Sequence, residues 1–165
     1  MSEASPRGIE IERKFLVDRA PASLPEGEAI DQGYLVVGED GVEVRVRRRA
    51  GTTTLTVKSG PGMVRTEEEI PLEERRFETL WPLTDGRRVT KTRHLIPLDA
   101  GLVAELDIYS GPLDGLLTAE IEFPSVEASE AFRPPDWLGR EVTGDARFAN
   151  QALALEGRPP HMSKG

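Results

Sequence analysis

Ile9-Glu10-Ile11-Glu12-Arg13-Lys14-Phe15-Leu16-Val17, near the start of the chain, alternates charged and apolar side chains with the period of a β-strand. One face of this strand carries Glu10, Glu12 and Lys14, and the opposite face is apolar apart from Arg13. Two carboxylates on one face of a strand lie about 6–7 Å apart, close enough to hold one divalent cation between them. A lysine one step further along can contact an anion that the same cation binds. The strand therefore predicts half of a metal and phosphate site, while an amphipathic strand with its charged face in water is the alternative.

The same charged alternation recurs along the chain, and this repetition favours the functional interpretation. Eight segments have the period of two that is typical of strands: 9–17, 30–37, 42–48, 53–59, 64–70, 87–96, 102–109 and 117–123. Helical patterns are restricted to residues 71–83, a segment from Ser125 to Phe132, and a last segment, 146–155, that Asp145 can cap. Because strands follow one another without alternating with helices, the pattern indicates an antiparallel sheet.

An antiparallel sheet of this size tends to close into a barrel. The helical segments carry Phe77, Trp81, Phe132 and Leu153, which need an apolar surface to pack against. The simplest arrangement turns the apolar strand faces outward beneath the helices and the charged faces into the lumen. We therefore predict a mainly β (α+β) fold, a closed eight-stranded antiparallel β-barrel with a charged lumen and a few flanking helices. The alternative is the opposite barrel, with an apolar lumen and a charged exterior.

The predicted lumen holds charges of both signs, because a lumen of many like charges would be intolerable. Its acids are Glu10, Glu12, Glu67, Glu69, Glu105, Asp107, Glu120 and Glu122. Its bases are Lys14, Arg45, Arg47, Lys58, Arg65, Arg87, Lys91 and Arg93. The acids can bind divalent metal ions and pair with bases, and the remaining bases can hold a polyanion.

The composition restricts the classes of partner and cofactor. The chain of 165 residues is long enough for one domain, which we place at residues 1–157, followed by a disordered tail at 158–165. A net charge of −8 argues against general nucleic-acid binding. With no cysteine and two histidines, a metal site must use oxygen ligands, which favours one or two Mg²⁺ or Mn²⁺ ions over zinc. No apolar run is long enough for a signal peptide or a membrane span, so we expect a cytoplasmic protein without a membrane partner.

The first strand resembles the Glu-x-Glu-x-Lys signature of the CYTH superfamily, the triphosphate tunnel metalloenzymes, at Glu10, Glu12 and Lys14. This superfamily includes class IV adenylyl cyclases, thiamine triphosphatases, inorganic triphosphatases and fungal RNA triphosphatases. An ordered series of further motifs strengthens the resemblance, which covers roughly residues 8–155. The series is Arg45-x-Arg47, Lys58, Arg65-x-Glu67-x-Glu69, Lys91-x-Arg93, Glu105-x-Asp107 and Glu120-x-Glu122. The short length and the sequence of residues 9–16 are similar to small bacterial members regarded as inorganic triphosphatases.

The resemblance implies a tunnel in which metal and phosphate have separate ligands. The implied metal ligands are Glu10, Glu12, Glu120 and Glu122. The implied phosphate ligands are Lys14, Arg45, Arg47, Lys58, Lys91 and Arg93, and the phase of the strands adds Arg65 and Arg87. The supporting residues Glu67, Glu69, Glu105 and Asp107 would orient bases, or help to bind a second metal or the attacking water. The implied reaction is metal-dependent hydrolysis of inorganic triphosphate, with catalysis assigned to Glu10, Glu12, Lys14, Lys91, Glu120 and Glu122.

Other substrates and one other class of protein stay open. The chain could be a thiamine triphosphatase, a nucleoside triphosphatase or a class IV adenylyl cyclase, although it lacks the His-Phe lead that cyclase members carry ahead of their signature. A non-catalytic polyphosphate or triphosphate sensor needs bases more than paired carboxylates, so the intact acids argue against it. The expected partner is a small-molecule triphosphate or polyphosphate, and the sequence leaves open whether the barrel forms a homodimer.

Several side chains have both a structural and a functional interpretation. Tyr34 could hydrogen-bond a phosphate or activate Lys58, as a Tyr–Lys pair is thought to do in some relatives, but a strand tyrosine is more often core with a satisfied hydroxyl. Arg87 is in phase with the lumen bases but also suits a solvated strand end. Asp145 fits a helix cap better than a metal ligand. Glu43 is ambiguous between lumen and surface.

Overall fold

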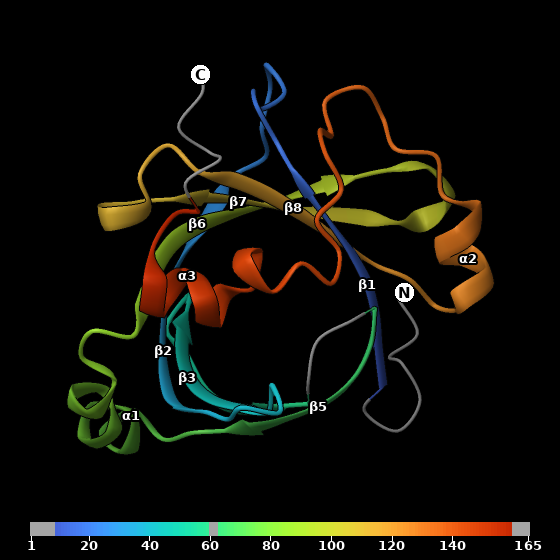
Figure 1. Cartoon of the computed structure of the whole chain (residues 1–165). Coiled ribbons are helices and arrows are strands. Elements are labelled where there is room, and N and C mark those ends of the chain that lie inside the picture. Colours follow the sequence, from blue (N-terminus) through green and yellow to red (C-terminus); the bar gives the residue numbers. More distant parts are fainter. Residues whose placement is uncertain (1–8, 60–62, 160–165) are drawn as a thin grey trace.

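The computed structural model describes residues 9–59 and 63–159 and shows a closed barrel of antiparallel strands (Figure 1). The strands are β1 (Ile9–Leu16), β2 (Gly27–Val37), β3 (Glu43–Arg49), β4 (Thr52–Lys58), β5 (Val64–Pro71), β6 (Arg88–Pro97), β7 (Val103–Tyr109) and β8 (Leu117–Glu122). Around the barrel they follow the order β1-β5-β4-β3-β2-β6-β7-β8. The predicted eight-stranded antiparallel barrel is confirmed. Of the predicted tail, only residues 158 and 159 lie within the described range.

The barrel closes through β1, which pairs with β5 along its first half and with β8 along its second half. In the pairing with β8, Glu12 lies opposite Glu122 and Lys14 lies opposite Glu120. Side chains at directly opposed positions of antiparallel strands have Cβ atoms about 4.5–5.5 Å apart. Closure therefore brings together charged groups that lie far apart in the sequence.

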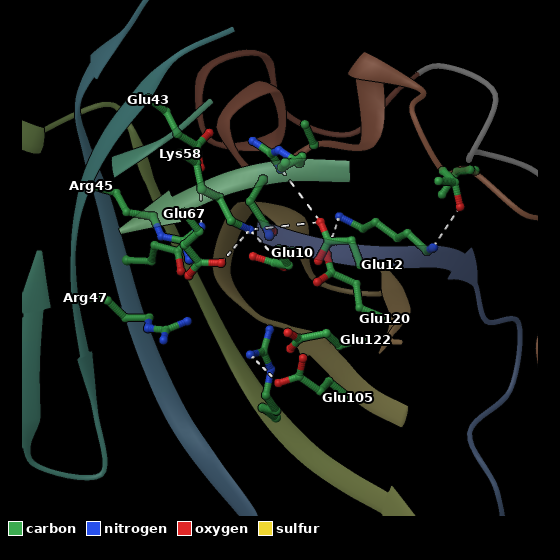
Figure 2. A pocket seen from close by; sticks show the side chains of 18 of the residues that line it. Glu10, Glu12, Glu43, Arg45, Arg47, Lys58, Glu67, Glu105, Glu120 and Glu122 are labelled. Atoms are coloured by element: carbon green, nitrogen blue, oxygen red, sulfur yellow. Dashed lines mark hydrogen bonds and ion pairs between the residues drawn. The ribbon is translucent and has the colours of Figure 1, made fainter. Parts of the chain in front are cut away.

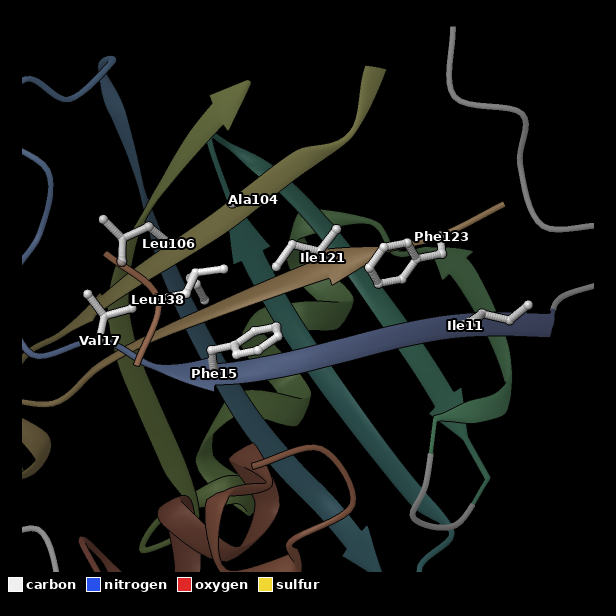
Figure 3. Close-up of a cluster of buried hydrophobic side chains, with 9 residues drawn as sticks. Ile11, Phe15, Val17, Ala104, Leu106, Ile121, Phe123 and Leu138 are labelled. Atoms are coloured by element: carbon white, nitrogen blue, oxygen red, sulfur yellow. The ribbon is translucent and has the colours of Figure 1, made fainter. Parts of the chain in front are cut away.

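The main hydrophobic core lies outside the barrel, between the strands and the segments that cover them (Figure 3). Phe15 of β1 and Ile121 of β8 belong to it and are no more than 2% exposed. The helix α2 (Val126–Ala131) begins after Ser125, whose side chain accepts a hydrogen bond from the first turn. It leads to Phe132, whose ring packs edge to face against Phe15. On this side, the apolar strand faces lie outward beneath a helix, as predicted.

A second helical cover follows β5 in the chain. It consists of α1 (Glu74–Leu80) and the 3-10 helix η2 (Trp81–Thr84), so the helical pattern predicted for this stretch is divided in two. Phe77 is buried and stacks on Trp81 with ring centroids 5.2 Å apart, and the guanidinium of Arg48 from β3 lies 4.5 Å from the Phe77 ring centroid. Two further 3-10 turns, η3 (Asp99–Gly101) and η4 (Gly111–Leu113), connect the last strands. Within the described residues, no helix has the length and apolarity needed to cross a bilayer.

The C-terminal segment differs from its prediction. The single helix expected there is wrong, because the chain forms the 3-10 helix η5 (Ala146–Phe148) and then α3 (Asn150–Glu156). Ala149 between them has extended backbone angles, φ −64° and ψ 142°. Asp145 caps η5 by accepting from the backbone N–H of Arg147. The break turns the chain into the opening of the barrel, where Figure 1 shows both short helices.

Candidate active site

The charged faces of the strands surround one cavity of about 210 Å³ inside the barrel (Figure 2). The acidic strand residues in its wall are Glu10, Glu12, Glu43, Glu67, Glu69, Glu105, Glu120 and Glu122. The basic ones are Lys14, Arg45, Arg47, Arg49, Lys58, Arg65, Lys91 and Arg93. All eight strands contribute at least one wall residue, Gln32 being the contribution of β2. The predicted charged lumen is therefore confirmed, and the opposite barrel with an apolar lumen is wrong.

The C-terminal segment covers one end of this cavity and is tied to the barrel by two hydrogen bonds. Residues between Val142 and Asn150 line the cavity. Lys14 Nζ donates a hydrogen bond of 2.6 Å to the carbonyl oxygen of Phe148. The hydroxyl of Tyr109 donates one of 2.6 Å to Oδ1 of Asn150. Ala149, where the predicted C-terminal helix is interrupted, is thus one of the places where this segment reaches the lumen.

The acid cluster on β1 is built around a shared ammonium group. Lys58 Nζ lies 3.4 Å from Glu10 Oε1 and 4.0 Å from Glu12 Oε1, and Glu67 Oε2 lies 3.8 Å from the same nitrogen. Burial, the charge of Glu120 and the hydrogen bond to Glu10 raise the pKa of Glu12 well above its usual range. Burial also opposes ionisation of Glu10, but the hydrogen bond from Glu12 and the charge of Lys58 lower its pKa. The Glu10–Glu12 pair therefore holds a proton that a bound cation could replace.

The chemistry of these groups fits a hard divalent cation. Carboxylate oxygens are the ligands that Mg²⁺ and Mn²⁺ prefer, and Glu10 Oε2 is buried without a hydrogen-bond partner among the described residues. Figure 2 shows Glu120 and Glu122 of β8 beside Glu10 and Glu12 of β1. In the described ranges no three metal-ligating side chains are already gathered into a cation site, and Lys58 lies among these carboxylates. A bound cation would neutralise the carboxylates that the ammonium group of Lys58 now neutralises.

Asp107 fixes two bases in the opposite part of the wall. It is 1% exposed, and its carboxylate accepts from Arg93 at 2.8 and 2.9 Å and lies 2.8 Å from Lys91 Nζ. Burial opposes its ionisation, but the charges of Lys91 and Arg93 prevail and lower the pKa of Asp107. Burial lowers the pKa of Lys91 to about 8, although Asp107 opposes the shift. Asp107 does not line the cavity, whereas Lys91 and Arg93 do. Asp107 therefore holds both bases in the wall, where an anion in the cavity can contact them.

Positive charge is concentrated on β3. Arg45 is 6% exposed, with Nη1 at 3.4 Å from Glu43 Oε1, and Arg47 donates to Glu69 at 3.2 Å. Burial and the charges of Arg45 and Arg93 lower the pKa of Arg47 to about 10. A guanidinium group with a lowered pKa is one whose charge is only partly compensated by its surroundings. This part of the cavity is therefore suited to a bound anion.

Arg65 and Glu105 complete the predicted set within the wall. Arg65 Nη1 lies 3.8 Å from Glu12 Oε1, and its Nε donates to the carbonyl oxygen of Ser59 at 3.0 Å. Glu105 accepts from Arg93 at 2.9 Å. Every predicted site residue lines the cavity except Tyr34, Arg87 and Asp107. The structure thus brings the predicted metal ligands and most predicted phosphate ligands into one chamber.

Arg87 was expected among the lumen bases, and that prediction is wrong. Its Nε donates to the carbonyl oxygen of Tyr34 at 2.9 Å and its Nη2 to that of Leu83 at 2.6 Å. Arg87 lies in the connection between η2 and β6, which begins at Arg88. Its side-chain direction is therefore not set by the alternation of the strand. Arg87 therefore holds backbone carbonyl groups at the edge of the barrel.

Tyr34 lies behind the cavity wall and is fully buried. Its hydroxyl oxygen lies 2.6 Å from Nε2 of Gln32. Burial and the charge of Glu43 raise the pKa of Tyr34 above its usual range, so the hydroxyl stays protonated. Lys58 is directed at the acid cluster through its ion pairs. The core interpretation of Tyr34 agrees with this burial and with the hydrogen bond between its hydroxyl and Gln32.

Some wall residues were missed by the sequence prediction. Arg49 lines the cavity and has the same phase on β3 as Arg45 and Arg47, so the alternation could have placed it. Glu43, which the sequence left open between lumen and surface, lies in the cavity wall. Gln32 is a neutral residue, and sorting strand faces by charge gave no signal for it. The segment between Val142 and Asn150 has no strand period, and only the tertiary structure places it at the cavity.

Known proteins that resemble the chain share a name. An inorganic triphosphatase of Nitrosomonas europaea is 47% identical over 150 residues, which cover 88% of this chain and 97% of that protein. An inorganic triphosphatase of Acetivibrio thermocellus is 39% identical over 149 residues, which cover 88% of this chain and 93% of that protein. The crystal structure of the inorganic triphosphatase NE1496 matches with a TM-score of 0.69 at 43% identity, over 91% of this chain and 97% of that chain. No protein-family model matches the chain.

These similarities extend over nearly the whole length of each protein, so they include the barrel and its covering segments as well as the signature on β1. The closed strand order and the charged lumen agree with the same relationship. With its fold, its motifs and its relatives in agreement, the chain belongs to the inorganic triphosphatase family of the CYTH superfamily.

Proposed function

We propose that the protein hydrolyses inorganic triphosphate to pyrophosphate and phosphate inside the barrel, with the help of a divalent metal ion. The observation that carries this proposal is the composition of the cavity wall. Carboxylates of β1 and β8 share one chamber with buried bases of β3, β4 and β6, and none of the described wall residues is aromatic. A nucleobase or thiazole ring would find no stacking surface there, whereas phosphate oxygens would find many donors. The names of the relatives support the same substrate.

The bases would bind and orient the phosphate chain. Arg45, Arg47 and Arg93 present planar forks that can donate two hydrogen bonds to one phosphate group. Lys58 and Lys91 add compact charges that can stabilise the negative charge that develops on the leaving group. Phosphoryl transfer depends mainly on such positioning and charge neutralisation. The buried ion pairs keep these groups in place before substrate arrives.

A proton acceptor for the attacking water can be chosen between the two acids of β8. Burial and the negative charge of Glu10 raise the pKa of Glu122. Burial opposes ionisation of Glu120, but the charges of Lys14 and Lys58 hold its pKa well below its usual range. Glu122 is therefore the stronger base, and we assign it the proton of the water. A Mg²⁺ or Mn²⁺ ion held by Glu10, Glu12 and Glu120 would supply Lewis-acid activation of a phosphate oxygen and would leave the Glu122 carboxylate uncoordinated as the base.

Phosphate release from inorganic triphosphate, ATP and thiamine triphosphate tests the proposal. Each substrate is offered with Mg²⁺, with Mn²⁺ and with EDTA. We expect fast release from inorganic triphosphate that EDTA abolishes. Release mainly from ATP or thiamine triphosphate would contradict the substrate assignment, and release that persists in EDTA would contradict the metal. Binding of triphosphate without any release would place the protein among non-catalytic sensors.

A further inference from the structure

Gln32 is a neutral amide in a cavity wall whose other strand residues are charged. It is 1% exposed and lies in register with Arg47 on the neighbouring strand β3. Its Nε2 makes a hydrogen bond of 2.6 Å with the hydroxyl of Tyr34. Its Oε1 is buried and has no hydrogen-bond partner among the described residues. A buried polar atom without a partner costs free energy, so this atom requires an explanation.

The orientation of the amide supplies the explanation. With Nε2 toward Tyr34, the tyrosine hydroxyl accepts a hydrogen bond from Gln32. Its own proton then has no acceptor in the described part of the chain. The oxygen and nitrogen of an amide have nearly the same shape, and only the hydrogen-bond network distinguishes them. Turned by half a rotation, Gln32 accepts from the hydroxyl of Tyr34 through Oε1, and its NH₂ group takes the unpartnered position.

We infer that Gln32 is a substrate-binding residue whose NH₂ group donates to a phosphate oxygen, and that Tyr34 is a positioning residue that fixes the amide in this orientation. This inference rests on the proposed function, because it names a further ligand for the same phosphate chain. Tyr34 does not line the cavity, so its effect on substrate passes through Gln32.

The charges around Gln32 explain why a neutral donor stands at this position. Arg47, its partner in register, already lies close enough to Arg45 and Arg93 for their charges to disfavour its own. Another lysine or arginine at this position would increase that repulsion. An amide adds a donor for phosphate without adding charge, and it needs only a second group to hold its orientation. The buried hydroxyl of Tyr34 is that group.

Binding of inorganic triphosphate, measured by calorimetry in EDTA and again with Ca²⁺, tests the inference independently of turnover. Gln32→Met keeps the shape of the side chain and removes its donor, and we expect the Kd to rise about tenfold, the effect of losing one hydrogen bond to a charged group. Gln32→Glu keeps an acceptor for Tyr34 but places a negative charge beside the phosphate, and we expect a larger loss. The matched control is Gln151→Met in α3, a glutamine that does not line the cavity, which should leave the Kd unchanged.

The role of Tyr34 requires a double-mutant cycle. Tyr34→Phe should raise the Kd for triphosphate about as much as Gln32→Met does. The double variant should have a Kd no higher than that of the poorer-binding single variant, because both changes remove the same interaction. Losses that multiply would show that Tyr34 acts through another group and would overturn its positioning role. A wild-type Kd in both Gln32→Met and Gln32→Glu would overturn the role of Gln32.

Different results would contradict the proposed function and the role of Gln32. If the wild-type protein binds triphosphate but releases no phosphate, hydrolysis is contradicted while the binding cycle still decides the role of Gln32. If the wild-type protein binds no triphosphate in either condition, both proposals are overturned. The melting temperature of each variant shows whether a loss of binding reflects a loss of folded protein, and Gln32→Glu serves where Gln32→Met does not fold.

Discussion

Glu12 is a partly buried carboxyl group whose pKa is raised by desolvation, by the charge of Glu120 and by its hydrogen bond to Glu10. Glu12→Gln preserves its shape and fixes it in a neutral form, so we expect little change in melting temperature. Metal-dependent phosphate release should fall by about a hundredfold or more, since a metal ion contributes several kcal/mol of transition-state stabilisation. The measurement is kcat at increasing Mg²⁺ concentration. Glu68→Gln on the exposed face of β5 is the control, and full activity in Glu12→Gln would contradict the metal site.

Lys91 predicts a pH dependence on the alkaline side. Burial lowers its pKa from 10.5 to about 8, and the groups that act on it are Asp107, Arg93 and Glu120. Because the folded-state pKa is depressed, Lys91 loses its charge as the pH rises through about 8, and its attraction for phosphate is lost with it. We expect kcat/KM, which reports the free enzyme, to fall above that pH.

The comparison with Lys91→Met isolates this titration from that of the substrate and the metal. The variant should have a lower kcat/KM at neutral pH, and the ratio of wild type to variant should shrink as the pH passes about 8. Profiles measured from about pH 6.5 to about pH 9.5 provide the ratio. A ratio that stays constant over this range would show that Lys91 does not titrate there.

Among the secondary-structure elements, α2 depends on a single cap. Ser125 Oγ accepts from the N–H of Ala128 at 3.0 Å, and this short helix covers the outer core. Ser125→Ala should cost about 1 kcal/mol of folding free energy. For a chain of this length that corresponds to a fall of about 2–4 °C in melting temperature. Because α2 contributes no residue to the cavity, kcat should not change, and Ser125→Asp should restore the lost stability. An unchanged melting temperature in Ser125→Ala would contradict the importance of the cap.

The strands could be predicted from the sequence because their period of two persists over whole segments. Arg45 and Lys58 line the cavity as the alternation required. The strand period failed at Arg87, which lies just outside its strand. The helical pattern failed at the C-terminal segment, where Ala149 interrupts the predicted helix. In both places a tertiary contact overrides a local pattern, and a local pattern carries no information about such a contact.

The residues of the candidate site also differ in how far the sequence could predict them. Charged residues could be assigned to the lumen because their signs and phases repeat from strand to strand. Gln32 carries no charge, and its importance follows from two hydrogen-bonding groups that only the folded chain brings together. The contact of Lys14 with the carbonyl oxygen of Phe148 joins residues 134 positions apart. Such a backbone acceptor leaves no trace in the sequence.

Considered as a whole molecule, the barrel combines a chamber for phosphate with a C-terminal segment that covers one of its ends. The cover is attached by the hydrogen bond from Tyr109 to Asn150 and by that from Lys14 to Phe148. Lys14 is one of the proposed phosphate ligands, so the cover and the site share a residue. The proposed preference for a small inorganic substrate over a bulkier organic triphosphate should therefore depend on how firmly this segment is held.

Tyr109→Phe tests that dependence, because it removes the hydroxyl that donates to Asn150 while the ring can keep its packing in the cluster with Val89 and Leu153. The loss of one buried hydrogen bond should weaken the attachment by about 1 kcal/mol. The uncovered form should then be populated about fivefold more, and the kcat/KM for ATP relative to inorganic triphosphate should rise by about the same factor. Asn150→Asp keeps an acceptor for the hydroxyl and should leave this ratio near that of the wild type. If Tyr109→Phe lowers the melting temperature but not the selectivity, the covered end does not control entry, and the choice of substrate must be made by the charged wall alone.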